Sequence, residues 1–411
     1  MKFNLNEFLI GVANILDIIE LDIFDLSTNH SKRISYISEK IAVEMGLSKE
    51  ARFDLASLSL MHDNGASMKI LHENLKGDLK EKIDMMESRK EHCLIGENNI
   101  KEFPFITKPK NIIKYHHERY DGSGFFGLLK DEIPLLAQII SFADLLDLTF
   151  DLKNINNKDN IIEFVQDNKG KYFSALIVDV FSKISENNQF WEGLTDENIE
   201  YSLRETIPLF ECELNYNEIR TITTTFAKII DSKSRFTQIH SEGLSEKLEK
   251  MAKFYKIDET MTLKLLIAAD LHDIGKLAIS NNILEKPDKL SKLEFDKIKE
   301  HPNIAKQCLQ NISGFEEIVK LISNHHEKLN GSGYPEGLMA DELDFNSRLI
   351  TCMDIYQALS EDRPYRKAMS QFEASQVLKS MALAGELDVD IVRDVIYVYS
   401  NLFENNAINE V

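Results

Sequence analysis

The stretch HHEKLNGSGYPEG, residues 325–337, decides the fold because a close copy of it, HHERYDGSGFFG, occupies residues 116–127. The two copies lie about 210 residues apart, and the same offset recurs along the whole chain. Histidines and aspartates repeat within one residue of this offset as the pairs His30 and His240, His62 and His272, His92 and His301, His116 and His325, His117 and His326, Asp63 and Asp273, and Asp144 and Asp354. Only His72 among the histidines has no counterpart. A fixed period of this kind indicates a tandem duplication of one module.

The hydrophobic pattern around these residues is helical in both halves. In segments such as YFSALIVDVFSKI (172–184) and TLKLLIAADLHD (262–273), apolar residues recur at spacings of three and four residues, and alternating strand patterns are scarce. We therefore predict an all-α protein with two tandem helical bundles. The expected divisions are residues 1–185, a helical connector over residues 186–214, and residues 215–411.

The composition excludes several classes of protein. The chain has 411 residues, 43% of them hydrophobic, which is enough for a buried core, and its net charge of −20 disfavours a partner that is a nucleic-acid polymer. No signal peptide and no run of ~18 apolar residues is present, so we expect a cytoplasmic protein without a membrane span. The scattered cysteines predict reduced thiols packed as small apolar residues, at Cys93, Cys212, Cys308 and Cys352.

The repeated residues are imidazoles and carboxylates, which suit borderline divalent ions such as Fe, Mn, Zn, Ni or Co. Each set holds more ligands than one tetrahedral ion needs and is sufficient for two ions that share a bridging carboxylate. Two ions ~3.5–4 Å apart are a common device for phosphoester hydrolysis. His272 and Asp273 are adjacent in the chain, so they can reach neighbouring positions of one cluster.

The second half resembles the HD-GYP subfamily of the HD superfamily of metal-dependent phosphohydrolases. The matching segments are IIDSKSRFTQIHSEG (229–243), HDIGK (272–276), His301-Pro302, HHEKLNGSGYPEGL (325–338), and the run from Asp354 to RPYRKA (363–368). The resemblance covers residues 215 to 411 and implies a bacterial signalling enzyme that hydrolyses a cyclic dinucleotide.

The resemblance also implies roles for single residues. One ion would be held by His240, His272, Asp273 and Asp354, and the other by Asp273, His301, His325 and His326, with Asp273 as the bridge. Lys276 would donate to the scissile phosphate or to the attacking hydroxide. Substrate contacts would come from the loop residues Gly331, Gly333 and Tyr334, and from Arg363 and Arg366, which would grip phosphates.

The second half departs from the subfamily at three positions. Leu329 stands where an aromatic residue is usual, and Gln357 replaces a frequent acid three residues after Asp354. A glutamate that binds a third ion in some relatives is Phe236 here, so we expect two ions, Fe or Mn before Ni, Co or Zn.

The first half keeps the whole ligand set but lacks other parts. The candidate ligands are His30, His62, Asp63, His92, His116, His117 and Asp144. HDIGK becomes HDNGA, so Ala66 replaces Lys276, and Tyr-Pro becomes Phe125-Phe126. We expect a degenerate domain that binds metal with weak or no hydrolysis. A fully active site for another substrate and a purely structural partner are the alternatives.

The functional prediction is a metal-dependent cyclic-dinucleotide phosphodiesterase. Cyclic di-GMP is the first choice, cut to pGpG and on to GMP, and 3′,3′-cyclic GMP-AMP is the close runner-up. A general HD nucleotidase is a weaker alternative, because the loop at 331–335 and the RPYR run speak against it. An alternative of another class is a non-catalytic protein that binds a cyclic dinucleotide or scaffolds partners. A homodimer or signalling partners would be compatible with any of these hypotheses.

Overall fold

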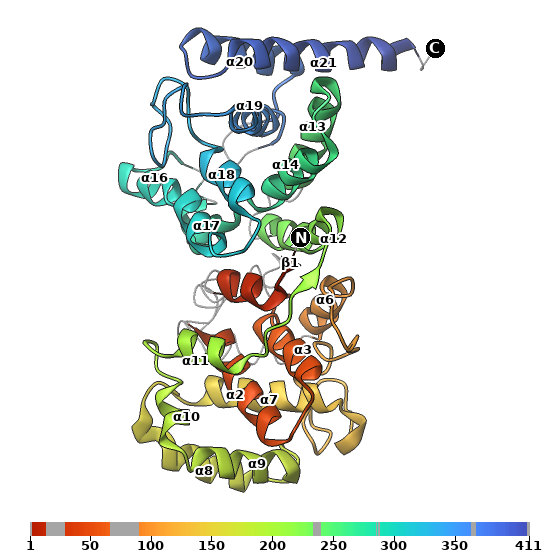
Figure 1. Ribbon diagram of the computed structural model, residues 1–411, viewed down its shortest axis with the longest axis vertical. Helices are drawn as coiled ribbons and strands as arrows, with labels where there is room; N and C mark the ends of the chain where they lie inside the picture. The colour runs from red at the N-terminus through yellow and green to blue at the C-terminus, as the bar shows by residue number, and fades with distance from the viewer. Residues whose placement is uncertain are drawn as a thin grey trace. The chain divides into compact units, whose positions relative to one another are not determined.

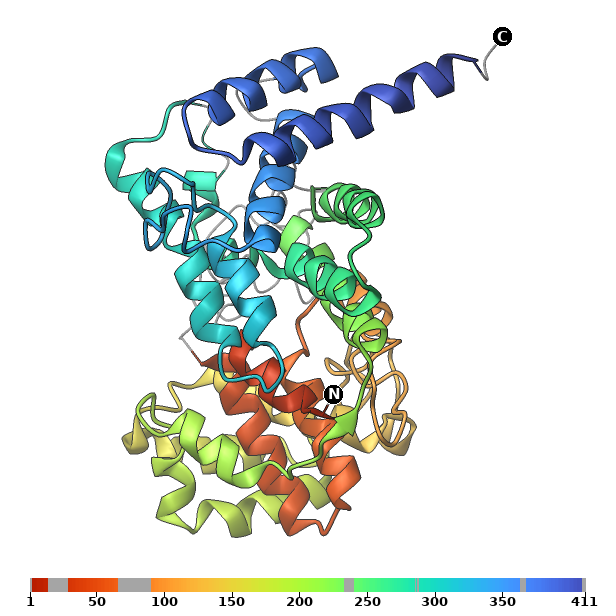
Figure 2. The same cartoon turned by 45° about the horizontal axis from the view of Figure 1, so that its top comes forward.

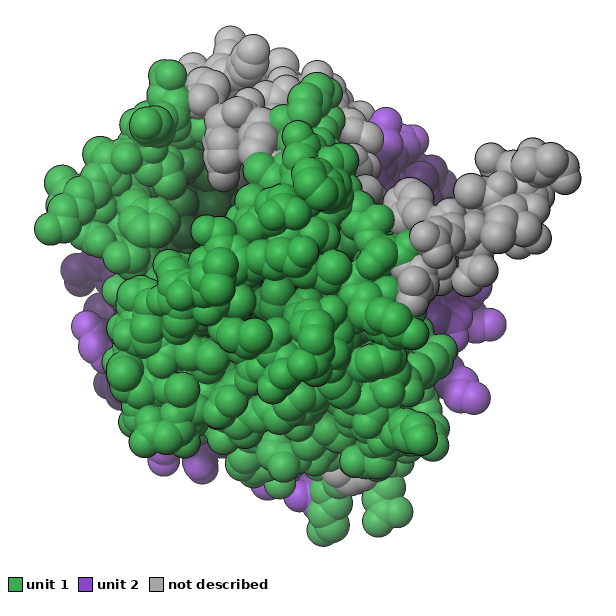
Figure 3. All heavy atoms as spheres, turned by 90° about the horizontal axis from the view of Figure 1, so that it is seen from above, with its two compact units in different colours: residues 1–2, 213–411 green, residues 3–212 purple. Residues whose placement is uncertain are grey.

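The computed structural model describes residues 2–13, 29–65, 90–232, 240–284, 286, 288–362 and 367–408. Within these ranges the regular secondary structure is helical apart from two short paired strands, β1 (Lys2–Phe3) and β2 (Cys212–Glu213) (Figure 1). The all-α prediction is therefore confirmed. The chain divides into two compact units, residues 3–212 and residues 1–2 with 213–411, which Figure 3 distinguishes by colour.

The first unit centres on α2 (His30–Glu44), which packs against α3 (Lys49–Leu60), α7 (Leu135–Thr149), α9 (Ala175–Ser185) and α11 (Ile199–Thr206). Residues 5–13 are also helical, and their apolar side chains are buried. The remaining elements are α6 (Glu91–Asn99), η1 (Lys130–Glu132), η2 (Ile155–Asn157), α8 (Lys158–Asp167) and α10 (Asn188–Glu192).

Residues 186–212, most of the segment expected as a connector, belong to this first unit. They are helical at α10 and α11, and the contact of α11 with α2 places them on the bundle. Trp191 is 2% exposed and donates its indole N–H to the Ser185 carbonyl oxygen at 2.9 Å. The apolar pattern of this segment is therefore explained by packing within the bundle.

The second unit centres on α14 (Glu259–Leu271), which packs against α12 (Tyr216–Ser232), α13 (His240–Tyr255) and α18 (Glu316–Asn324). At the C-terminal end α20 (Gln371–Leu383) and α21 (Val389–Ile408) pack against each other (Figure 2). The remaining elements are η3 (Ile274–Ala278), α15 (Asn281–Leu284), α16 (Lys292–Lys299), α17 (His301–Leu309) and α19 (Phe345–Leu359).

The two units repeat their helices at the offset found in the sequence. The helices α2, α3, α6 and α7 of the first unit correspond to α13, α14, α17 and α19 of the second. The repeat extends to the caps, because Ser48 accepts a hydrogen bond from the Ala51 N–H at the start of α3, and Asp258 accepts from the Met261 N–H at the start of α14. One difference is α18, whose counterpart in the first unit is a series of turns before His116.

Among the described helices, none combines the length and the apolar character that crossing a bilayer requires. The buried side chains of both units are those of helices packed on one another, and α14 is buried along Leu265, Leu266, Ile267 and Ala268.

Candidate metal centres

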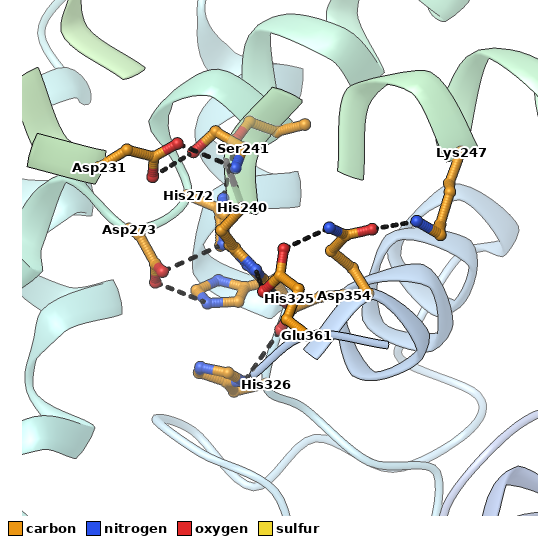
Figure 4. Close-up of polar contacts among 12 residues, drawn as sticks. Asp231, His240, Ser241, Lys247, His272, Asp273, His325, His326, Asp354 and Glu361 are labelled. Carbon is orange, nitrogen blue, oxygen red and sulfur yellow. Dashed lines mark hydrogen bonds and ion pairs between the residues drawn. The ribbon is translucent and has the colours of Figure 1, made fainter. Parts of the chain in front are cut away.

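Each predicted ligand of the second unit lies at the end of a helix or faces its neighbours across the bundle. His240 and His301 are the first residues of α13 and α17, His272 and His325 follow the last residues of α14 and α18, and Asp354 lies within α19. Asp231 of α12 accepts hydrogen bonds from the backbone and the hydroxyl of Ser241, which holds the first turn of α13 in place. Figure 4 shows the side chains of His240, His272, His325 and Asp354 pointing toward one another.

The structure brings all seven predicted ligands of the second unit together. Asp273 Oδ1 lies 3.3 Å from His301 Nε2 and 3.9 Å from His325 Nε2, whereas its Oδ2 lies 3.3 Å from His272 Nε2. The two carboxylate oxygens of Asp273 thus face different imidazoles, an arrangement compatible with a bridging ligand. Asp354 lies 3.1 Å from His240 Nε2 and 3.8 Å from both His272 Nε2 and His326 Nδ1.

The backbone fixes the orientation of three of these rings. The Nδ1 atoms of His272, His301 and His325 lie 2.8, 2.7 and 2.6 Å from the carbonyl oxygens of Ala269, Ile298 and Ile322. A carbonyl oxygen only accepts, so each Nδ1 carries the proton and each Nε2 presents a lone pair to the cluster. The cap position of each histidine explains this contact, since its ring reaches a carbonyl three residues back.

Burial and charge prepare His301, His325 and Asp273 to bind a cation. Burial lowers the pKa of His301, and burial with the neighbouring charges of His272 and His301 lowers the pKa of His325 to about 3, so both rings are neutral near pH 7. Burial opposes the ionised form of Asp273, yet the charges of His272 and Lys276 hold its pKa well below the usual range. Neutral imidazoles beside an ionised carboxylate are the protonation states that metal ligation requires.

The buried polar atoms at the cluster centre also fit metal ions. His272 Nε2 and Asp273 Oδ1 are buried and make no hydrogen bond with protein atoms. Unsatisfied buried polar atoms are costly, and a bound cation would satisfy both. Ligand atoms within 4.8 Å of one another form three groups in this unit: Asp273, His301, His325 and His326; His240, His272 and Asp273; and His272, His325 and Asp354.

The first unit repeats this arrangement. Asp63 Oδ1 lies 3.6 Å from His92 Nε2 and 3.3 Å from His116 Nε2, and Asp63 Oδ2 lies 3.5 Å from His62 Nε2. Asp144 completes the set, at 3.5 Å from His30 Nε2, 3.7 Å from His62 Nε2 and 3.6 Å from His117 Nδ1. The buried atoms Asp63 Oδ1, His62 Nε2, His116 Nε2 and Asp144 Oδ1 make no hydrogen bond. All seven predicted ligands of the first half are therefore together as well.

Lys276 lies at the edge of the second cluster, with its Nζ 2.6 Å from Asp273 Oδ2 and a quarter of its side chain exposed. It therefore presents a positive charge both to the cluster and to solvent, as a donor to a phosphate would. Gly275 before it is required by packing, because a Cβ there would lie 2.0 Å from the His301 carbonyl oxygen. Ala66, which replaces Lys276 in the first half, lies outside the described residues.

The loop after the paired histidines is held by a buried glutamate that the sequence analysis did not single out. Glu327 accepts hydrogen bonds from the backbone N–H groups of Glu336, Gly337 and Leu338 at 2.7, 3.1 and 3.0 Å. Glu118 does the same in the first unit for Phe126 and Leu128, at 2.6 and 2.7 Å.

The predicted substrate residues of this loop lie beside the cluster. Gly331 has a φ of 73°, a conformation that favours glycine, and a Cβ on Gly333 would lie 2.4 Å from the Lys328 nitrogen. The Tyr334 ring lies 4.7 Å from the His326 ring, and the Tyr334-Pro335 bond is cis. The other predicted contacts, Arg363 and Arg366, and Phe236, on which the expectation of two ions depends, lie outside the described residues.

A second acid that sequence reasoning missed supports His240. Glu361 Oε2 lies 2.9 Å from His240 Nδ1, and the contact spans 121 residues of chain. Burial favours the neutral ring, but hydrogen bonds to Asp354 and Glu361 raise the pKa of His240 to about 9. Gln357 is buried beside them and hydrogen-bonds both Glu361 and Lys247. The departure noted at Gln357 is thus accompanied by an acid one helical turn later.

Comparison with known proteins agrees with this geometry. The HD domain family matches residues 15–173 and 224–391, which together make up more than half of the chain. The chain belongs to the HD domain family. The two matched segments confirm the tandem halves, and each contains one complete set of the candidate ligands.

Individual members resemble the chain over different lengths. A 3′3′-cGAMP-specific phosphodiesterase of Vibrio cholerae is 29% identical over 422 residues, covering 99% of this chain and 94% of that protein. A cyclic di-GMP phosphodiesterase of Pseudomonas aeruginosa is 30% identical over 166 residues, covering 40% of this chain and 39% of that protein. The crystal structure of a cyclic GMP-AMP-specific phosphodiesterase of V. cholerae shares the fold, with a TM-score of 0.66, 24% identity, and coverage of 97% of this chain and 98% of that one.

Proposed function

We propose that this HD domain protein is a cyclic-dinucleotide phosphodiesterase whose reaction takes place in the second unit. The observation that carries the proposal is the cluster around Asp273, in which buried acceptor atoms without hydrogen bonds lie beside the partly exposed Lys276 side chain. The first unit repeats the cluster, but its sequence has alanine in place of that lysine. We assign it metal binding with little or no hydrolysis.

The distances support the roles that the resemblance implies for the ligands. His240, His272, Asp273 and Asp354 would hold one divalent ion, and Asp273, His301, His325 and His326 would hold the other. The donors are nitrogen and oxygen only, which suits Fe, Mn, Zn, Ni or Co, and Fe or Mn is our first choice among them. Divalent ions at such a centre supply Lewis acidity, which activates water and neutralises charge on phosphoryl oxygens.

The protein's own groups complete the site. Lys276, 2.6 Å from Asp273, would donate a hydrogen bond to the scissile phosphate, and its charge would offset the negative charge that develops there. The Gly331–Tyr334 loop borders the cluster through the Tyr334 ring and would contact the nucleotide. Arg363 and Arg366 are proposed to bind the second phosphate of the substrate, which a chain with a net charge of −20 must attract through local cations.

Two substrates compete within this class. The relative that aligns with almost the whole chain is named for 3′3′-cGAMP, which favours this hybrid dinucleotide as the first substrate to test. The sequence analysis placed cyclic di-GMP first, and the shorter match to a cyclic di-GMP phosphodiesterase keeps it as the second candidate. Both substrates offer the same two phosphodiester bonds, so the choice between them depends on contacts with the bases.

The test is separation of products by chromatography after incubation with Mn²⁺ or Fe²⁺. The full chain is offered 3′3′-cGAMP, cyclic di-GMP and a mononucleotide in parallel. We expect a linear dinucleotide from at least one cyclic substrate and faster turnover of 3′3′-cGAMP. Release of phosphate from the mononucleotide alone would indicate a general nucleotidase. Tight binding of a cyclic dinucleotide without any product would contradict the proposed activity and support a sensor.

A further inference from the structure

The two candidate metal centres differ in one donor atom. In the first unit His92 is followed by Cys93 on α6, whereas in the second unit His301 is followed by Pro302 on α17. The Cys93 side chain is buried and lies beside the imidazoles of its unit. Among the described residues, it is the one cysteine that falls in a group able to hold a metal ion. The expectation that the thiols pack as small apolar residues agrees with the burial of Cys93 but leaves its imidazole neighbours out of consideration.

The distances around Cys93 suit direct coordination. Its Sγ lies 3.3 Å from His92 Nε2, and His92 Nε2 lies 3.1 Å from His117 Nε2. The donor atoms of His92, Cys93, His116 and His117 all lie within 4.8 Å of one another. Ligands placed tetrahedrally at the zinc–nitrogen and zinc–sulfur bond lengths are separated by about 3.5 Å, so a small ion fits among these four.

The second observation is a buried nitrogen without a hydrogen bond, His116 Nε2, which belongs to the same group of four donors. His116 Nδ1 contacts the Ile113 carbonyl oxygen, which leaves Nε2 without the proton. His116 Nε2 is buried and makes no hydrogen bond. An ion at the centre of these four donors would satisfy this nitrogen and would also give the buried Cys93 thiol a partner.

We propose that Cys93 is a metal ligand, and that with His92, His116 and His117 it binds a thiophilic divalent ion, Zn²⁺ first, in the N-terminal unit. Coordination replaces the S–H bond with a sulfur–metal bond and releases the thiol proton to solvent, with no change in oxidation state. The thiolate and the Asp63 carboxylate, 3.3 Å from His116 Nε2, together balance the two charges of the ion.

A protein donor in place of a water molecule changes what such a centre can do. Structural zinc sites are filled by four protein ligands, whereas hydrolytic sites keep a position for water. The Cys93 centre therefore stabilises the N-terminal unit and contributes little to hydrolysis. This role is independent of the reaction proposed for the second unit, whose candidate ligands include no sulfur.

Cobalt substitution distinguishes the two centres, because a thiolate bound to Co²⁺ produces a near-ultraviolet charge-transfer band and imidazoles or carboxylates do not. The full chain is stripped with a chelator and loaded with Co²⁺ alone. We expect the band in the wild type and its loss in Cys93→Ser. The matched control is Cys352→Ser, which removes another buried thiol. The counterpart of Cys352 in the first unit is the buried core residue Phe142, and we expect the band to remain in this variant.

Metal analysis after loading with Zn²⁺ provides a second measurement. Cys93→Ser should bind about one zinc fewer per chain than the wild type, and Cys93→His should recover that zinc without the charge-transfer band. Circular dichroism checks that each variant is folded. Absence of the band from the Co²⁺-loaded wild type, or its persistence in Cys93→Ser, would overturn the proposal whether or not the protein cleaves a cyclic dinucleotide.

Discussion

The two units hold the same seven candidate ligands but support them with different neighbours. In the first unit Asp147 lies 2.7 Å from His30 Nδ1 and also pairs with Arg33. At the corresponding positions of the second unit stand Gln357 and Gly243, and a Cβ on Gly243 would lie 2.2 Å from the Gln357 amide nitrogen. A side chain at that position would displace the Gln357 amide, and the aspartate–arginine pair of the first unit has no equivalent at these two positions of the second.

The difference shows which parts of the cluster are interchangeable. His240 keeps an acidic partner in Glu361, which approaches Nδ1 from one helical turn further along the chain than Asp147 does. The carboxylate at Nδ1 is thus preserved while the residue that supplies it changes. Partners of this kind orient a metal-binding imidazole and increase its basicity.

The largest effect should come from the bridging carboxylates. Asp273→Ala removes the oxygens that face His272, His301 and His325, so we expect phosphodiesterase activity to fall by about a thousandfold or more. The matched variant Asp63→Ala should leave a large fraction of the activity, although it should lower the metal content of the first unit. Steady-state kinetics with metal analysis tests both. Equal and complete loss in the two variants would refute the division of roles.

The second-largest effect on activity should come from replacing Lys276. Lys276→Ala removes a donor proposed to act on the phosphate, and loss of one such donor costs roughly 10²–10³ in kcat. Metal content should remain at the wild-type value, because the ligands are unchanged. The control Lys286→Ala breaks a partly exposed pair with Glu294 and should leave kcat unaltered. Loss of metal from Lys276→Ala would instead assign the lysine to the architecture of the cluster.

A smaller effect is expected from the acids behind the histidines. Glu361→Gln weakens the support of His240 and should lower metal affinity in the second unit by about 10–100-fold, with a parallel loss of activity at limiting metal. Asp147→Asn should weaken metal binding in the first unit without this loss of activity. Titration with Mn²⁺, followed by activity and by calorimetry, measures the two affinities. Unchanged affinity in Glu361→Gln would show that its contact with His240 is incidental.

The smallest effect concerns the stability of the first unit. Burial raises the pKa of Glu39 on α2 to about 8, against the opposing charge of Arg52, whereas a hydrogen bond from Lys253 lowers the pKa of the exposed Glu249 at the corresponding position. A carboxyl with a raised pKa stabilises the fold fully below its unfolded pKa of ~4.3, and this contribution is lost as the pH rises through 8.

Glu39→Gln should therefore gain stability relative to the wild type as the pH increases from 5 to 9, which would be measured as a rise in its melting temperature relative to that of the wild type. Glu249→Gln should show no such gain. Thermal unfolding of the metal-free chain at both pH values provides the comparison. If Glu39→Gln stabilised the protein by the same amount at pH 5 and at pH 9, the protonation assigned to Glu39 would be contradicted.

The fold and the family could be predicted from sequence because the repeat compares the chain with itself. His30 and His240, or Asp144 and Asp354, have little meaning singly, yet their common offset identified the two bundles and the sets that the structure brings together. The assignment of these residues to particular ions stays a prediction. The domain limits near residues 186–214 were harder to predict from the sequence, because the apolar pattern of a helix is the same whether the helix connects two units or packs on one of them.

The supporting residues could not be predicted for a physical reason. Glu361 reaches His240 across 121 residues, and no periodicity or local motif marks such a contact. Glu327 lies inside a motif that was recognised, but its role depends on the loop folding back over it. The sequence analysis predicted a packed thiol at Cys93 because no other cysteine lies near it in the chain. The neighbours that matter are histidines, one adjacent in the chain and two about 24 residues further on.

The buried glutamates Glu327 and Glu118 give the two loops a common anchor that does not depend on the side chains displayed outside it. Each carboxylate binds backbone N–H groups, which every residue except proline provides. The Tyr334-Pro335 pair of one loop and the Phe125-Phe126 pair of the other are accordingly carried on similar frames. Selection can thus alter what such a loop recognises, one exposed position at a time, without first having to redesign how it folds.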